Sequence, residues 1–235
     1  MVRPARKEDK TMISQGKTLK LLPSHLKAMS RNAQLVIGPR GSGKSFWWGA
    51  LQNPYVRAYL EENSSDRNIV RKEDWVWAGF SNLLNFDVYP DKFEFYSLMH
   101  GLNIQPRLIW RTLVTWLLSP AGHPIVKLDC WDERARYVVE NPEPVDHLLY
   151  DVNQELNREG QYQLILFDAL EHSAYDKKDL HRLVRGLLMV ALDFRSFSNI
   201  RAKVFLRPDQ IHPENTFDFV DSSKLLSESV ELSVP

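Results

Sequence analysis

The stretch from Gly38 to Ser45, read GPRGSGKS, limits the fold of this chain more than any other feature. It matches the pattern G-x-x-x-x-G-K-[ST] and follows an apolar run, Gln34–Ile37, which predicts a short buried strand. Glycines let a loop turn its backbone N–H groups inward around phosphate groups. The stretch therefore predicts a phosphate cradle between a strand and a helix, whose N-terminus attracts the same anion.

We expect this loop to hold a nucleotide together with Mg²⁺. Lys44 is expected to reach the β- and γ-phosphates, and the Ser45 hydroxyl is expected to ligate Mg²⁺. No guanine-reading N/T-K-x-D motif occurs in the chain, so ATP is favoured over GTP. The expected nucleotide contacts are Gly38, Pro39, Arg40, Gly41, Ser42, Gly43, Lys44, Ser45 and Phe46.

A magnesium site of this kind also needs an acidic residue on a neighbouring strand. The run LILFD supplies Asp168 at the carboxyl end of an apolar strand, where ligands bind in open parallel sheets. The alternative is an Asp that only caps a helix after a buried strand. The position after Asp168 is Ala169, so the next acid is Glu171, and a later run, VFLRP, ends near Arg207.

The stretch LILFDALE resembles the Walker B sequence hhhhD-[G/A]-h-[D/E] of STAND and KAP-type P-loop NTPases, ASCE ATPases related to AAA+ proteins. VFLRP resembles the strand that ends in Arg-Pro in those families, and the resemblance covers roughly residues 30–232. It implies catalytic roles for Lys44, Asp168, Glu171 and Arg207. Glu171 would orient or deprotonate the attacking water, and Arg207 would sense the γ-phosphate. A solvated helix acid and an ion pair with Asp209 are the alternatives for these two residues.

The resemblance also implies a helical lid or winged helix after the last strand. This chain ends at Pro235, shortly after its last predicted strand, so we expect either a fragment or a partner that supplies the missing parts. That partner would be a second copy of the chain, in a homo-oligomer, or a separate effector protein. An arginine finger, if one is used, would come from a neighbouring subunit. The candidates are Arg182, Arg185, Arg195 and Arg201.

Apolar strands alternate with helical patterns along the chain, which is typical of a parallel sheet with helices on both faces. We therefore predict a three-layer α/β/α P-loop NTPase domain over residues 21–235, with a mostly parallel sheet, preceded by a flexible basic arm over residues 1–20. A helical insertion is expected at about 88–160, between the second strand and the Walker B strand. Strands are expected at 34–37, 75–80, 162–168, 202–208 and 230–232, and helices after an N-cap at Ser24 and at 45–52, 91–101, 106–118, 145–160 and 178–194.

Composition narrows the class of protein further. Hydrophobic residues make up 43% and charged residues 26%, with 30 basic and 30 acidic residues, as in a soluble globular protein. This balance does not indicate nucleic-acid binding. A single cysteine, Cys130, indicates a reducing compartment, and no secretory signal or apolar run of membrane-spanning length is visible. The seven histidines show no zinc-ligand spacing with Cys130. A cytoplasmic location is expected.

The leading hypothesis is a Mg²⁺-dependent ATPase that acts as a conformational or assembly switch, and the family analogy suggests bacterial defence or stress. The alternatives are a P-loop small-molecule or nucleotide kinase and a nucleotide-binding module with little turnover. Phe46, Trp47 and Trp48 follow the loop directly. Their rings point about 100° apart on a helix, so they cannot all face the sheet. We expect Trp47 or Trp48 to meet the insertion, a lid or another chain.

Overall fold

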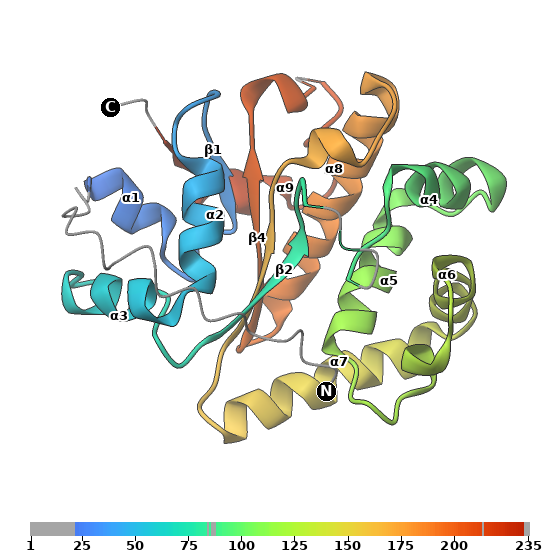
Figure 1. Ribbon diagram of the computed structural model, residues 1–235, viewed down its shortest axis with the longest axis horizontal. Helices are drawn as coiled ribbons and strands as arrows, with labels where there is room; N and C mark the ends of the chain where they lie inside the picture. The colour runs from blue at the N-terminus through green and yellow to red at the C-terminus, as the bar shows by residue number, and fades with distance from the viewer. Residues whose placement is uncertain (1–21, 84, 86–87, 213, 233–235) are drawn as a thin grey trace.

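One five-stranded parallel sheet forms the centre of the protein. The computed structural model describes residues 22–83, 85, 88–212 and 214–232; the predicted basic arm, residues 1–20, lies outside them. The strand order is β2-β3-β4-β1-β5, and every pairing is parallel (Figure 1). The strands are β1 (Leu35–Ile37), β2 (Trp75–Phe80), β3 (Gln163–Phe167), β4 (Ile200–Leu206) and β5 (Val230–Glu231).

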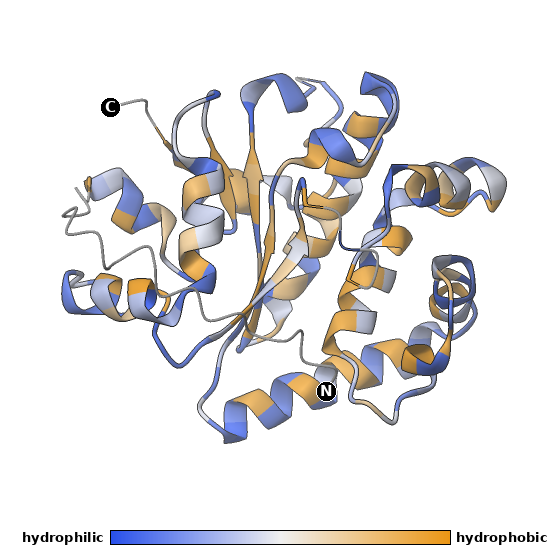
Figure 2. Ribbon diagram, in the orientation of Figure 1, coloured by the Kyte–Doolittle hydropathy of each residue, from blue (hydrophilic) through white to orange (hydrophobic). Residues whose placement is uncertain are grey.

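Helices cover both faces of the sheet and give three layers. The apolar side chains on the two faces form separate cores, because β3 and most of β4 are buried from both sides. One face carries α1 (Pro23–Ala28), α2 (Lys44–Gln52) and α3 (Pro54–Glu62). The other carries α4 (Lys92–Tyr96), α5 (Pro106–Leu118), α6 (Trp131–Glu140), α7 (Pro142–Arg158), α8 (Lys177–Asp193) and α9 (Ser222–Ser227). In Figure 2 the apolar sides of α5 and α8 face inward.

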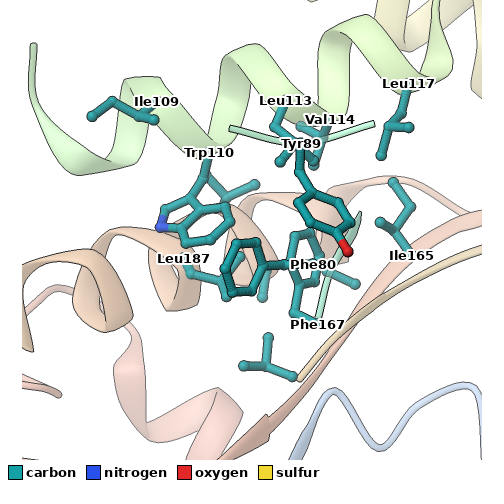
Figure 3. Close-up of a cluster of buried hydrophobic side chains, with 14 of the residues drawn as sticks. Phe80, Tyr89, Ile109, Trp110, Leu113, Val114, Leu117, Ile165, Phe167 and Leu187 are labelled. Carbon is teal, nitrogen blue, oxygen red and sulfur yellow. The ribbon is translucent and has the colours of Figure 1, made fainter. Parts of the chain in front are cut away.

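The helices between β2 and β3, α4 to α7, lie within the range of the predicted insertion, about 88–160. The core on the face that carries α4 to α9 is built around aromatic rings from this segment and from the strands, including Phe80, Trp110 and Phe167 (Figure 3). The Trp110 indole N–H donates to the Leu183 carbonyl oxygen at 2.8 Å, which fastens α5 to α8. A Cβ atom on Gly186 would lie 2.7 Å from the Arg107 backbone nitrogen, so these two helices approach closely only because that position is glycine.

Proline positions account for the main errors in the predicted helices. The predicted N-cap at Ser24 is wrong: α1 begins at Pro23 and Leu22 is the N-cap. Pro54 does end α2, as expected, but it also begins α3, and the Asn53 side chain accepts a hydrogen bond from the Tyr55 backbone N–H at 2.9 Å. Proline suits the first helical position because its missing N–H would have no partner there.

Most other predicted elements are confirmed with shifts of one to three residues at their ends. The strand β2 and the helix α5 begin and end where the sequence predicts. The helix α9 was not predicted, and a π-helical turn, η2 (Ser97–Gly101), continues α4. No helix in the described part of the chain combines the length and the apolar character needed to cross a membrane.

Candidate functional site

The loop over residues 38–45, called here the glycine-rich loop, joins β1 to α2. Gly41 and Gly43 have φ values of +86°, in the left-handed region that residues with a Cβ atom rarely adopt. A Cβ atom on Gly38 would collide with Ser42 Oγ and would lie 3.0 Å from the Leu232 carbonyl oxygen. The loop conformation thus requires glycine at all three positions.

Lys44 is the first residue of α2 and lies inside the glycine-rich loop. Its ammonium group donates to the carbonyl oxygens of Gly38 and Pro39, both at 2.7 Å, and lies 3.4 Å from Ser42 Oγ. Burial lowers the pKa of Lys44, while the negative charge of Asp168 opposes this shift. The free N–H groups and the dipole of the α2 N-terminus add positive potential beside this ammonium group.

Asp168 follows β3 directly and faces the start of α2. Its side chain is buried, which raises its pKa, and a hydrogen bond from Ser45 partly opposes that shift. A neighbouring-strand position for Asp168 was predicted, and this is wrong: β4 lies between β1 and β3. The two ends still meet because the carboxyl ends of parallel strands share one edge and α2 lies across the sheet. Ser45 and Asp168 together offer a hydroxyl and a carboxylate oxygen, ligands that suit Mg²⁺.

Glu171 and Arg207 form an ion pair at the same edge of the sheet. Arg207 Nη1 donates to Glu171 Oε1 at 2.8 Å, and two further Arg207 nitrogens donate to Asp209, both at 2.9 Å. The ion pair with Asp209 that was weighed for Arg207 is therefore present, whereas the pair with Glu171 was not predicted. Both acids raise the pKa of Arg207, Asp209 more strongly. Ala169 has a φ of 55°, unusual for a residue other than glycine, and it begins the turn that leads to Glu171.

Gln210 completes this group and was not predicted. Its amide donates to Glu171 Oε2 at 2.6 Å, so both carboxylate oxygens of Glu171 accept hydrogen bonds from the protein. Gln210 lies in a short turn that begins at Pro208, and its own Oε1 accepts from the Arg207 backbone N–H at 2.8 Å. No motif in the sequence marks this residue, because its role depends on where the end of β4 lies.

These residues surround one cavity of about 440 Å³. It is lined by Arg40, Gly41, Gly43, Lys44, Ser45, Phe46, Asp168, Ala169, Glu171, Arg207 and Gln210. Three predicted contact residues, Gly38, Pro39 and Ser42, do not line it; they lie behind Lys44 and hold its ammonium group. The remaining predicted site residues are brought together from three separate segments of the chain, 40–46, 168–171 and the end of β4.

The three aromatic residues after the loop differ from the prediction. Trp47 is only 2% exposed and lies against His25, with ring centres 5.2 Å apart. Trp48 is half-buried, and its indole N–H points to the Leu166 carbonyl oxygen on β3 at 3.4 Å. The outward ring is Phe46, which is 40% exposed and lines the cavity. The expectation that Trp47 or Trp48 would be the outlying ring is wrong, because α1 covers Trp47 and the sheet accommodates Trp48.

A larger groove of about 1370 Å³ lies away from these residues, between α5, α7, α8 and residues 217–224. Its arginines are held within the chain: Arg107 by Asp193, Arg111 by Asp146, Arg195 by Glu228 and Arg185 by the carbonyl oxygen of Asp218. Arg182 pairs with Asp179 at 3.2 Å, and Arg201 donates to backbone carbonyl oxygens. All four candidates for an arginine finger are therefore bonded inside their own subunit.

Comparisons with known proteins add no identification: no family model, no curated protein and no solved structure matches the chain. The resemblance to STAND and KAP-type proteins therefore depends on the motif residues. Among the described residues, no group of three or more His, Cys, Asp or Glu side chains could hold a metal ion. The functional interpretation depends on the geometry of the 440 Å³ cavity.

Proposed function

We propose that this protein is a P-loop ATPase that binds ATP and Mg²⁺ in the 440 Å³ cavity and hydrolyses ATP. One observation carries the proposal. The glycine-rich loop presents Lys44 and Ser45 to the same cavity as a buried carboxylate, Asp168, and a second acid, Glu171. These residues come from segments more than 100 positions apart in the sequence, and each has the chemistry that phosphoryl transfer from ATP requires.

Each residue has a defined task in this proposal. The backbone N–H groups of the loop and the Lys44 ammonium group bind the phosphates, with the dipole of α2 aligned to the same charge. Ser45 and Asp168 would hold Mg²⁺, which when bound neutralises phosphate charge. The Lys44 ammonium also donates to the carbonyl oxygens of Gly38 and Pro39, which keeps the loop in its cradle shape.

The proposed reaction is attack of water on the γ-phosphorus of ATP. A bond forms between the water oxygen and phosphorus while the bond to the β–γ bridging oxygen breaks, giving ADP and inorganic phosphate. Glu171 orients the water and accepts its proton. Each of its oxygens accepts one hydrogen bond, from Arg207 or from Gln210, and keeps a second lone pair for the water. A γ-phosphate would compete with Glu171 for Arg207, and this competition supports a switch.

The experiment measures ATP binding by calorimetry and phosphate release with Mg²⁺ in matched variants. Lys44→Ala should abolish ATP binding, whereas Lys72→Ala should not, because Lys72 is exposed in the loop before β2, at the opposite edge of the sheet. Circular dichroism should show that both variants are folded. Retention of tight ATP binding by Lys44→Ala would refute the proposed site.

Turnover is tested with two further variants. Glu171→Gln should bind ATP and lose phosphate release by about 100-fold or more. Asp209→Asn removes the other carboxylate that holds Arg207 and should affect phosphate release far less. Measuring particle size with and without a non-hydrolysable ATP analogue and Mg²⁺ then tests whether the switch changes assembly. A role in bacterial defence stays a prediction from the family resemblance.

A nucleotide-binding module with little turnover is the second candidate. The observation in its favour is that both carboxylate oxygens of Glu171 already accept hydrogen bonds, from Arg207 and Gln210, so this residue already has a structural role. This candidate predicts ATP binding that depends on Lys44, but phosphate release that is equally slow in the wild type and in Glu171→Gln. The comparison of these two proteins therefore separates the two candidates.

A further inference from the structure

The glycine-rich loop contains an arginine of its own. Arg40 is exposed, lies at the tip of the loop beside Gly41, and lines the cavity together with Glu171 and Arg207. Among the described residues, none forms a recorded hydrogen bond or ion pair with its side chain. Its guanidinium group is therefore available to a ligand without first breaking a bond within the protein.

Arg207, the other arginine of the cavity, is in the opposite situation. Three of its nitrogens donate to the carboxylates of Glu171 and Asp209 at 2.8–2.9 Å. Bidentate arginine–carboxylate pairs are among the strongest hydrogen bonds in proteins, so a phosphate can take Arg207 only in exchange for them. Arg40 has no such competitor, although both side chains reach the same space.

The charges of the cavity lining also favour a cation at Arg40. Apart from Arg40, two cations, Lys44 and Arg207, face two carboxylates, Asp168 and Glu171. Without Arg40 the lining would therefore be neutral, whereas ATP is strongly anionic. Arg40 gives the lining a net positive charge, which suits an anionic ligand. It is a planar donor with a fork that matches phosphate oxygens.

We propose that Arg40 contacts the γ-phosphate of ATP bound to its own chain and stabilises the charge that develops on it during hydrolysis. This inference rests on the proposed ATPase function. Arginines supply this stabilisation either from the same chain or from a partner. Here the same-chain source fits, because Arg40 lines the cavity while Arg182, Arg185, Arg195 and Arg201 are bonded elsewhere.

The test compares Arg40→Ala and Arg40→Lys with Arg67→Ala. Arg67 is a matched control because it is also an exposed arginine, in the loop that leads into the amino end of β2. Arg40→Ala should lower kcat for ATP hydrolysis about 100-fold or more while ATP binding weakens less than about 10-fold. The kcat of Arg40→Lys should lie between those of Arg40→Ala and the wild type, since lysine restores the charge without the forked guanidinium group. Arg67→Ala should match the wild type.

A binding measurement keeps the inference testable if turnover is slow. Because Arg40 is assigned to the γ-phosphate, the wild type should bind ATP more tightly than ADP, and Arg40→Ala should lose that preference. A wild type that binds ATP without turnover would overturn the hydrolysis proposal, and the ATP-to-ADP affinity ratio would still decide the contact of Arg40. A wild type that binds neither nucleotide would overturn both proposals.

Mixing variants decides which chain supplies the arginine. Lys44→Ala cannot hold ATP but keeps Arg40, and Arg40→Ala holds ATP but lacks the arginine. If Arg40 acts within its own chain, a mixture of the two variants has no more activity than the sum of the separate proteins. Recovery of activity in the mixture would show a contact between chains and overturn the proposal. An unchanged kcat together with an unchanged affinity ratio in Arg40→Ala would do the same.

Discussion

Lys203 offers a sharp test of how this sheet is held against α1. The residue lies in the middle of β4, next to the strand that leads into the glycine-rich loop, and its side chain is fully buried. Its amino group donates to the carbonyl oxygens of Ala28 at 2.7 Å and Ser30 at 2.9 Å, and also to that of Ala33. These three carbonyls form the end of α1 and the turn before β1, so one side chain closes this part of the fold.

The perturbation is Lys203→Met, which keeps the length of the side chain and removes its donors and charge. At pH 9 the Lys203 amine is neutral and can donate two hydrogen bonds, so at about 1 kcal/mol for each the variant should lose about 2 kcal/mol of unfolding free energy. Burial lowers the pKa of Lys203 from 10.5 to about 7. Between these values the unfolded chain binds a proton that the folded chain does not, so wild-type stability rises with pH.

Linkage gives the size of this rise. From pH 7 to pH 9 the wild type should gain about 2 kcal/mol relative to Lys203→Met, because the variant lacks the titrating group. The difference between the two proteins should therefore shrink to nearly zero at pH 7. Urea unfolding at several pH values measures it, with Lys72→Met as an exposed-lysine control. A difference that stays constant from pH 7 to pH 9 would refute the reasoning and show that the three carbonyls keep Lys203 charged.

Two further predictions concern the site itself. In thermal unfolding, Gly38→Ala should be less stable than the wild type, and it should also bind ATP more weakly, because its Cβ atom would meet Ser42 and Leu232. Gly49→Ala, whose Cβ atom would meet open space within α2, should be neutral or more stable by up to about 1 kcal/mol in the same assay. Burial raises the pKa of Asp168. At a pH above the ordinary pKa of an aspartate, the charged side chain therefore lowers the stability of the folded protein. Asp168→Asn should therefore be more stable than the wild type at pH 7, lose this advantage near pH 4, and show no Mg²⁺ dependence of ATP binding.

Features that depend on local backbone requirements could be predicted from the sequence. The glycine-rich loop needs positive φ at Gly41 and Gly43, and these residue types are legible without any knowledge of the fold. The strands β2 and β3 were predicted because helices on both sides of a parallel sheet make its strands continuously apolar. For the same reason the position of Asp168, at the end of such a run, could be predicted.

How these segments meet depends on the three-dimensional fold. Chain order does not give strand order, and the position of β4 between β1 and β3 is what places Arg207 beside Glu171 and brings Gln210 to the same carboxylate. The direction of the Phe46 ring likewise depends on which neighbours cover α2, as does the burial of Lys203 beneath α1. These contacts join residues far apart in sequence, and their energies depend on packing that no local pattern records.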